Sequence, residues 1–93
     1  MTLQIRPARA EDAALLAYWA QAMALETENK VLPDAEVLPG IARGIAEPVL
    51  ARYFVAEQDG VPAGTLMFTF EWSDWRAKNY YWIQVEYILH IKP

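Results

Sequence analysis

The sequence has no cysteine and only one histidine, His90, among its 93 residues. Without cysteine the chain forms no disulfide and offers no thiolate nucleophile. One histidine does not build a site held by several histidines, so we expect no metal centre. No apolar run approaches the ~20 residues of a membrane-spanning helix, and residues 1–7 lack the basic and apolar regions of a secretory signal. We therefore expect a soluble, cytoplasmic protein that does not bind membranes.

Positive charge is also scarce. The formal net charge is −4, with 8 Lys and Arg against 12 Asp and Glu. Nonspecific binding to nucleic acid or to an anionic membrane needs a positive surface, so this balance argues against both partners. Apolar residues, in contrast, make up 55% of the chain and aromatic residues 13%. Such a composition argues against intrinsic disorder, and the length corresponds to one domain, residues 1–93.

A β-hairpin is predicted in the middle of the chain. Asp59 and Gly60 form its turn, because both tolerate the positive φ that a two-residue hairpin turn requires. Arg52–Gln58 supplies one arm, and Thr65–Trp72 supplies the other, which is rich in residues that suit a pleated, half-buried surface. Gly64, early in the second arm, indicates a bulge or a close backbone approach.

Two helices are predicted between this hairpin and a first short strand at Thr2–Arg6. The first helix, residues 11–27, opens with acidic residues, which favour the positive end of a helix dipole, and continues with apolar residues at helical spacing. The second helix, residues 34–47, has Asp34 as its predicted N-cap. Pro39 lies inside it, so we expect a kink or two shorter pieces there.

A long strand, Tyr80–Ile91, is predicted after a charged turn at Arg76–Asn79. One set of its alternate residues, beginning with Tyr81 and Ile83, is uniformly bulky and fits a face buried in the core. The other set, beginning with Tyr80, mixes aromatic and polar groups, as a ligand cleft or a half-exposed face would. The order β-α-α-β-β-β indicates an α+β fold, in which an antiparallel four-stranded sheet packs against two helices.

Several segments, taken in order, resemble one enzyme family. They are Ile5-Arg6-Pro7-Ala8 with Glu11-Asp12, Tyr53–Glu57 with Asp59-Gly60, and Ala63-Gly64. Two further segments are similar to one subgroup of that family: Glu71-Trp72-Ser73-Asp74-Trp75 followed by Trp82-Ile83-Gln84, and Leu25–Asn29 at the acidic end of the first helix. The family is that of the GCN5-related N-acetyltransferases (GNAT). The resemblance covers residues 3–84 and implies the first half of the GNAT acyl-CoA N-acyltransferase fold, with acetyl transfer from acetyl-CoA to an amine.

The sequence also departs from this family. In the family the fourth strand leads into an Arg/Gln-x-x-Gly-x-Gly/Ala loop that opens a helix, whose backbone N–H groups hold the pyrophosphate of acetyl-CoA. The sequence to Pro93 has no such segment. The chain thus resembles the N-terminal half of an acetyltransferase, a truncated GNAT-like domain. We expect weak or no binding of acetyl-CoA and an inactive or incomplete enzyme.

The resemblance also implies roles for the fourth strand. Its backbone N–H groups, here near Val85 and Tyr87, would polarise the thioester carbonyl and contact the cofactor. A carboxylate can take the proton of the amine directly or through water. Glu86 on this strand and Glu71 on the neighbouring strand are the candidates. The simpler alternative for Glu86 is a solvated or paired strand residue.

Two further groups are candidates for binding the acceptor. Glu26 and Glu28, at the end of the first helix, would attract a cationic amine, or they are ordinary surface charges. The candidates for an aromatic pocket wall are Trp72, Trp75 and Trp82, and Asp74 beside Trp75 is a further candidate for binding the acceptor. Core packing is the alternative for Trp72 and Trp82, because aromatic side chains bury a large area. Trp75, in a polar turn, is harder to explain as core.

The strand Tyr80–Ile91 also predicts a partner. No following helix covers its apolar face, and exposed strand edges pair. We expect a homodimer or larger assembly through this strand, beside a small-molecule amine as substrate. The alternatives to an enzyme are a non-catalytic small-molecule-binding or assembly module built from the acceptor-side half, and a fragment without a function of its own.

Overall fold

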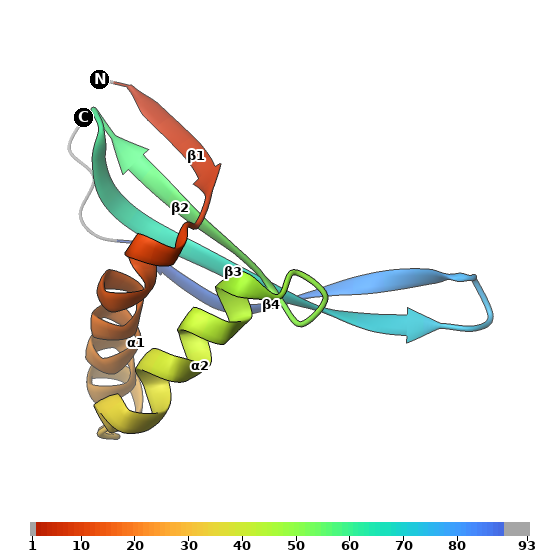
Figure 1. The fold of residues 1–93 in the computed structure, drawn as a ribbon, viewed down its shortest axis with the longest axis horizontal. Helices are drawn as coiled ribbons and strands as arrows, with labels where there is room; N and C mark the ends of the chain where they lie inside the picture. Colours follow the sequence, from red (N-terminus) through yellow and green to blue (C-terminus); the bar gives the residue numbers. More distant parts are fainter. Residues whose placement is uncertain (1, 89–93) are drawn as a thin grey trace.

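A computed structural model describes the backbone of residues 2–88 and the side chains of residues 2–84. The elements in chain order are β1 (Leu3–Pro7), the short 3-10 helix η1 (Ala10–Asp12), α1 (Ala13–Glu28), α2 (Asp34–Ala46), β2 (Arg52–Gln58), β3 (Val61–Ser73) and β4 (Lys78–Ile88). The four strands form one antiparallel sheet in the order β1-β2-β3-β4. This is the predicted α+β fold, with two helices against a four-stranded sheet (Figure 1).

The β2–β3 hairpin forms as its turn residues predict. Asp59 and Gly60 both have positive φ, 53° and 82°. The Asp59 side chain accepts a hydrogen bond from the backbone N–H of Thr2, and its own N–H donates to the Thr2 carbonyl, both at 2.7 Å. The turn therefore also anchors the start of β1. The register of β2 against β3 shifts where Ala56 pairs with Gly64 and the next pair skips one residue, which confirms the bulge predicted at Gly64.

The second helix differs from its prediction in two details. Pro33, not Asp34, is the N-cap, and Asp34 is the first helical residue, where its side chain accepts a hydrogen bond from Gln21. The helix also continues through Pro39 without a break. Proline removes one backbone donor, but the N–H groups of Glu36 and Val37 both bond to the Pro33 carbonyl, so the first turn is already closed before the proline.

The hydrophobic core lies between the helices and one face of the sheet. Its buried cluster consists of Ala13, Leu16, Ala17, Trp19, Ile41 and Val55. Val55, in the middle of β2, is completely buried. Alternate residues of a strand point to opposite faces, so Tyr53 and Val55 face the helices, whereas Phe54 between them faces away. We call these the covered face and the open face of the sheet.

The open face and the β3–β4 arm lie outside this core. The arm is the part of the hairpin from Phe68 to Ile83, and it extends beyond both helices (Figure 1). Tyr81 and Ile83 are 68% and 65% exposed, so the prediction that they form a buried face is wrong in the described structure. The strict alternation behind that prediction also breaks at a second bulge: Met67 pairs with Val85 but Phe68 pairs with Ile83, which leaves Gln84 as the extra residue.

No helix in the described range 2–88 is long and apolar enough to cross a membrane.

Candidate functional site

A hollow lined by aromatic residues opens on the open face. Its volume is about 680 Å³, and its lining consists of Pro48, Val49, Arg52, Phe54, Phe68, Phe70, Trp72, Asn79 and Tyr81. The rings form a connected cluster. Phe54 and Phe68 stack with their centroids 5.6 Å apart, and Tyr81 meets Phe68 and Phe70 edge-on at 5.6 and 5.5 Å.

The strand register explains why these rings gather. Residues directly opposite each other in an antiparallel pair share a face. Arg52 pairs with Phe68, Phe70 with Tyr81, and Trp72 with Asn79, so these three alternate residues of β3 share the face that lines the hollow. The turn that follows α2 closes one end with two apolar residues, Pro48 and Val49.

Arg52 is the charged residue among those that line this hollow. Its side chain is exposed, and it has no salt bridge or hydrogen bond to another side chain within the described part of the chain. Asn79 adds an amide to the lining. A cavity with aromatic walls and one cation is suited to a flat apolar group that carries a negative charge.

The outer edge of β4 is the second candidate feature. Among the described strands, β4 pairs only with β3, so one edge of its backbone has no strand beside it. The bulge at Gln84 interrupts the ladder on this strand, and its Nε2 donates to Thr69 Oγ1 at 2.9 Å. Bulges re-aim backbone groups and are frequent next to active sites. The predicted cofactor contacts at Val85 and Tyr87 lie on the strand directly after the bulge, and their side chains lie outside the described residues.

The register separates the two predicted bases. Glu71 pairs with Tyr80, whereas the backbone of Glu86 pairs with Leu66. Glu71 and Leu66 are five residues apart along β3, so the two positions are separated by roughly 16 Å at the rise of an extended strand. The Glu71 side chain is exposed, and the side chain of Glu86 lies outside the described residues. The two carboxylates are therefore not brought to one point.

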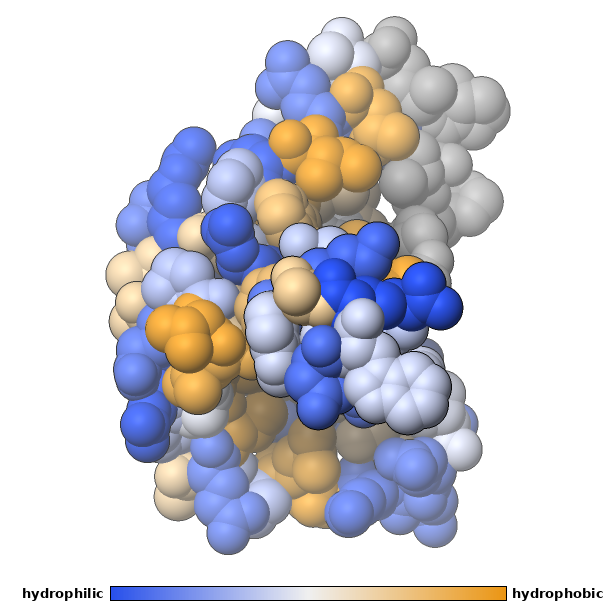
Figure 2. Space-filling view, turned by 90° about the vertical axis from the view of Figure 1, so that its right-hand side faces the viewer, coloured by the Kyte–Doolittle hydropathy of each residue, from blue (hydrophilic) through white to orange (hydrophobic). Residues whose placement is uncertain are grey.

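The predicted aromatic wall is divided between the two faces of the sheet. Trp72 lines the hollow, but Trp82 pairs with Thr69 and so belongs to the opposite face. Trp72 is 63% exposed and Trp82 53%, so core packing does not explain either residue. Trp75 is 95% exposed in the turn after β3, next to the exposed Asp74. Figure 2 looks onto this end of the molecule and shows separate apolar patches within a largely hydrophilic surface.

Glu26 and Glu28 occupy the last turn of α1. Both are exposed, and Asn29 ends the helix behind them with a left-handed backbone, φ 51°. This end of α1 lies on the helical side of the molecule, away from the tip of the β3–β4 arm (Figure 1). The structure therefore does not join the two glutamates to the predicted aromatic residues in one pocket.

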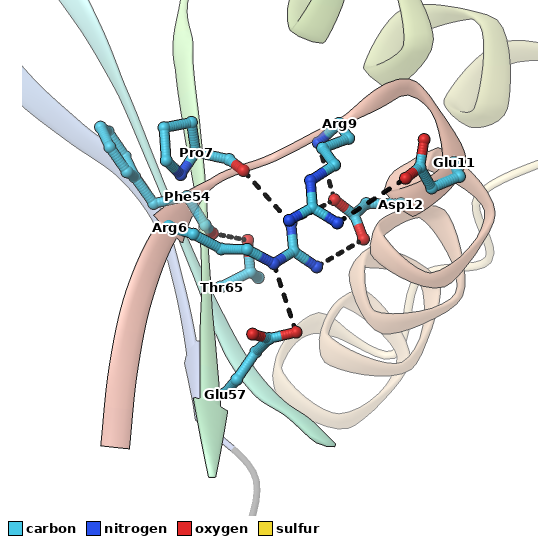
Figure 3. Close-up of polar contacts among 8 residues, drawn as sticks. All are labelled: Arg6, Pro7, Arg9, Glu11, Asp12, Phe54, Glu57 and Thr65. Atoms are coloured by element: carbon cyan, nitrogen blue, oxygen red, sulfur yellow. Dashed lines mark hydrogen bonds and ion pairs between the residues drawn. The ribbon is translucent and has the colours of Figure 1, made fainter. Parts of the chain in front are cut away.

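A polar cluster that the sequence did not predict links β1, η1 and β2. Arg6 holds Asp12 with two hydrogen bonds, Nη1 to Oδ2 at 2.7 Å and Nη2 to Oδ1 at 3.0 Å (Figure 3). Its Nε lies 3.2 Å from Glu57 Oε2, an ion-pair contact without the alignment of a hydrogen bond. The backbone N–H of Arg9 also donates to Asp12 Oδ2, at 2.7 Å. The sequence showed that the first helical turn is acidic. It did not indicate that Arg6, six residues before Asp12, binds that carboxylate.

The pKa shifts of Asp12 and Arg6 indicate that this cluster has a structural role. The hydrogen bonds from Arg6 lower the pKa of Asp12, although burial acts in the opposite direction. The bond to Asp12 correspondingly raises the pKa of Arg6. A carboxylate with a lowered pKa is a weak base, so Asp12 is not a candidate for proton removal.

A smaller apolar cavity, about 150 Å³, lies between the helices and the covered face. Its lining includes Trp19, Met23, Tyr53 and Thr65. Burial raises the pKa of Tyr53, and Thr65 Oγ1 donates to the Phe54 carbonyl at 2.9 Å. This cavity belongs to the core. Within the part of the chain described, no group of three or more His, Asp and Glu side chains could hold a metal ion.

Comparisons with known proteins bear on the fold. No family model matches the sequence, and no curated protein matches it. A solved structure described as a possible acetyltransferase from Clostridium difficile 630 is 31% identical, with a TM-score of 0.91, over 96% of this chain and 59% of that one. A GCN5-related N-acetyltransferase from Ralstonia eutropha JMP134 is 20% identical, with a TM-score of 0.71, over 95% and 63%.

A third solved structure is described as a predicted acetyltransferase with acetyl-CoA from Clostridium acetobutylicum. It is 17% identical, with a TM-score of 0.63, and the match covers 94% of this chain and 60% of that one. The chain thus spans a little less than two thirds of the length of each of these structures.

Proposed function

We propose that this chain provides the acceptor side and the thioester-facing strand of an N-acetyltransferase, which moves an acetyl group from acetyl-CoA to a small amine. The premise is the fold, which is that of the N-terminal half of GCN5-related N-acetyltransferases, as the sequence predicted. The observation that carries the proposal is the match to a possible acetyltransferase over 96% of the chain at 31% identity.

Such a transfer needs little covalent machinery from the protein. The thioester and the amine must be held in line, which by itself supplies a large part of the rate. Backbone N–H groups must face the oxygen that becomes negative in the transition state. The edge of β4, interrupted by the bulge at Gln84, is where the backbone can turn such donors outward. This supports Val85 and Tyr87 as the residues whose backbone meets the thioester.

The register supports different roles for the two glutamates. Glu86 lies between Val85 and Tyr87, so it is the base in this proposal. Glu71 lies roughly 16 Å farther along the sheet. In this proposal it contacts the acceptor or is a surface charge, and it does not reach the reacting atoms. Removal of a positioned general base lowers the rate by about 10²–10⁴-fold.

In this proposal the acceptor amine binds outside the hollow. The charged residue that lines the hollow is the cation Arg52, and it disfavours a second positive charge. The carboxylates of Glu26, Glu28 and Glu71 are exposed and would attract a cationic amine from other directions. They lie on two elements, α1 and β3, and support a cationic acceptor.

Acetyl-CoA is expected to bind this chain weakly. A dissociation constant near 10 mM would leave about 10% of the chain occupied at 1 mM ligand, and the stabilisation would be only about 0.06 kcal/mol. We therefore expect no measurable rise in melting temperature at 1 mM acetyl-CoA. A clear rise would contradict this expectation and point to a pyrophosphate site within the 93 residues.

The test is an acetyl-transfer assay that measures released coenzyme A. The 93-residue chain is given 1 mM acetyl-CoA and a panel of primary amines: a diamine, an amino sugar and a peptide with a free N-terminus. We expect slow acetylation of at least one amine. Glu86→Gln should lower that rate by about 10²-fold or more, whereas Glu71→Gln should change it by less than about tenfold.

The same assay can overturn the proposal. No transfer to any amine at 1 mM acetyl-CoA would overturn the proposal and favour the non-catalytic alternative. Equal activity in Glu86→Gln and the unchanged chain would remove Glu86 from the mechanism but leave the transfer itself in place.

A further inference from the structure

The tip of the β3–β4 arm presents an unusually exposed aromatic side chain. Among the large hydrophobic side chains described, Trp75 is the most exposed, at 95%. The turn around it is ordered: the backbone N–H of Arg76 donates to Ser73 Oγ at 3.3 Å, and Ala77 has a positive φ of 52°. Asp74, next to Trp75, is exposed and has no salt bridge within the described part of the chain.

The open face of the same arm, from Arg52 and Phe68 at its base to Trp72 and Asn79 nearer its tip, presents a complementary feature. The hollow there has aromatic walls, among them Phe68, Phe70 and Tyr81, and its cation, Arg52, lacks a partner among the described side chains. Its volume of about 680 Å³ lies in the range of roughly 300–1,000 Å³ typical of pockets that enclose drug-sized ligands. One indole ring fits in such a space.

We propose that two copies of this chain associate through their β3–β4 arms, so that Trp75 of each copy enters the aromatic hollow of the other. A two-fold interface requires that a patch which contacts another patch is contacted by it in return. Two arms packed in opposite directions, open face to open face, meet this requirement. The tip of each arm then lies over the base of the other arm.

The charges on the arm favour this arrangement over other contacts. Asp74 of one copy would reach the partner's Arg52, and the reverse pair forms by symmetry. The arm carries Glu71 and Asp74 against Arg76 and Lys78, so it is neutral in a chain whose net charge is −4. Two copies are therefore repelled less through their arms than through the rest of their surfaces.

The area available is sufficient. Aromatic side chains bury about 150–250 Å² each, and Trp72, Trp75 and Tyr81 from both copies together offer on the order of 1,000 Å². The lower limit for specific protein interfaces is about 1,000–1,200 Å². Trp and Arg are also the residue types that carry most binding energy at interfaces. This mode differs from pairing of the β4 edges, and it does not depend on the acetyltransferase proposal.

The experiment is sedimentation equilibrium of the 93-residue chain from 1 to 100 μM. We expect a dimer for the unchanged chain. Trp75→Ser should raise the dissociation constant by about 30-fold or more, as for a hot-spot residue. Val31→Ser, which removes an equally apolar, exposed side chain from the loop between α1 and α2, should leave it unchanged.

Exchanging the charges of Asp74 and Arg52 distinguishes loss of their contact from an effect on folding. Asp74→Arg and Arg52→Asp should each weaken the dimer, because each places like charges together, and the double variant should restore it. A monomer at 100 μM overturns the proposal. So does a dimer that Trp75→Ser leaves intact, which would indicate pairing of the β4 edges. A double variant that is weaker than both single variants overturns the Asp74–Arg52 contact.

Discussion

The two faces of one sheet differ in what their apolar residues do. On the covered face, Val55 is completely buried among the helices, and Leu16, Trp19 and Ile41 pack around it. On the open face, Ile83, Tyr81 and Trp72 are as apolar, yet each keeps more than half of its surface exposed. The strands supply both faces by the same alternation of residues.

This difference separates stability from recognition within 93 residues. Burial stabilises a fold in proportion to the apolar area removed from water, so the covered face carries the stability of the domain. Exposed apolar patches mark surfaces for ligands or partners, and in this chain the open face holds the aromatic hollow and the arm. Substitutions on the covered face should therefore affect unfolding, and those on the open face should affect association.

The largest expected effect is on the covered face. Trp19→Ala should lower the free energy of unfolding by about 3–5 kcal/mol, because it removes a buried aromatic ring and leaves a cavity. Urea denaturation followed by circular dichroism measures it. Trp72→Ala, which removes the same side chain from the open face, where it is 63% exposed, should cost about 1 kcal/mol. Equal losses at the two positions would contradict the distinction between the faces.

The next effect concerns the link that holds β1 to the helical layer. Asp12→Asn removes the charge that Arg6 binds with two hydrogen bonds, and it should cost about 2 kcal/mol. The melting temperature should fall by roughly 10 °C for a domain of this size. Glu11→Gln is the control, because Glu11 is exposed and lies 3.8 Å from Arg9 in a surface ion pair, which contributes little.

The same carboxylate predicts a dependence on pH. The pKa of Asp12 is lower in the folded chain than its usual value, which is about 3.9 in an unfolded chain. The unfolded state therefore binds the proton first as the pH falls. The stabilisation is fully present above about pH 4 and is lost as the pH falls through the folded pKa. The difference in urea midpoint between the unchanged chain and Asp12→Asn should shrink from pH 7 to pH 3; a constant difference would show that the charge is not its source.

A smaller effect tests the contact between α2 and the covered face. A Cβ on Gly44 would lie 2.7 Å from Cε1 of Tyr53, whereas a Cβ on Gly40 would meet no atom within 4 Å. Gly44→Ala should cost about 1–2 kcal/mol, because overpacking outweighs the gain in helix propensity. Gly40→Ala should instead stabilise the chain by about 0.5–1 kcal/mol. Thermal unfolding compares them, and stabilisation by both would mean that α2 does not approach Tyr53 closely.

Local sequence patterns were sufficient to predict the fold. Asp59-Gly60, the spacing of apolar residues in the first helix and the β-rich arms each specify a local conformation, and the elements follow from them. Two shorter pieces did not form at Pro39, because a proline that loses one bond can still lie inside a helix whose neighbours remain bonded. The bulge at Gln84 left no comparable signal, because an extra residue in a strand depends on its partner's register.

The site was harder to predict because it also depends on the register between strands. Trp72 and Trp82 were predicted to belong to one aromatic wall, but the strand register places them on opposite faces of the sheet. The sequence identified Arg52 only as the first residue of a strand. Its pairing with Phe68 shows that it lies in the aromatic hollow. Pairing between distant segments decides which side chains meet, and composition and local spacing do not contain it.

The smallest expected effect lies where the sequence pattern and the structure disagree most. The pattern of β4 placed Ile83 on a buried face, whereas 65% of its surface is exposed beside Phe68 on the open face. Ile83→Thr keeps a branched side chain suited to a strand, so it should change the free energy of unfolding by less than about 0.5 kcal/mol. The measurement uses urea denaturation in a Trp75→Ser background, so that association does not contribute. A loss of about 2 kcal/mol would instead match the removal of buried methyl groups. It would mean that Ile83 is covered within the single chain, and the open face would then belong to the core.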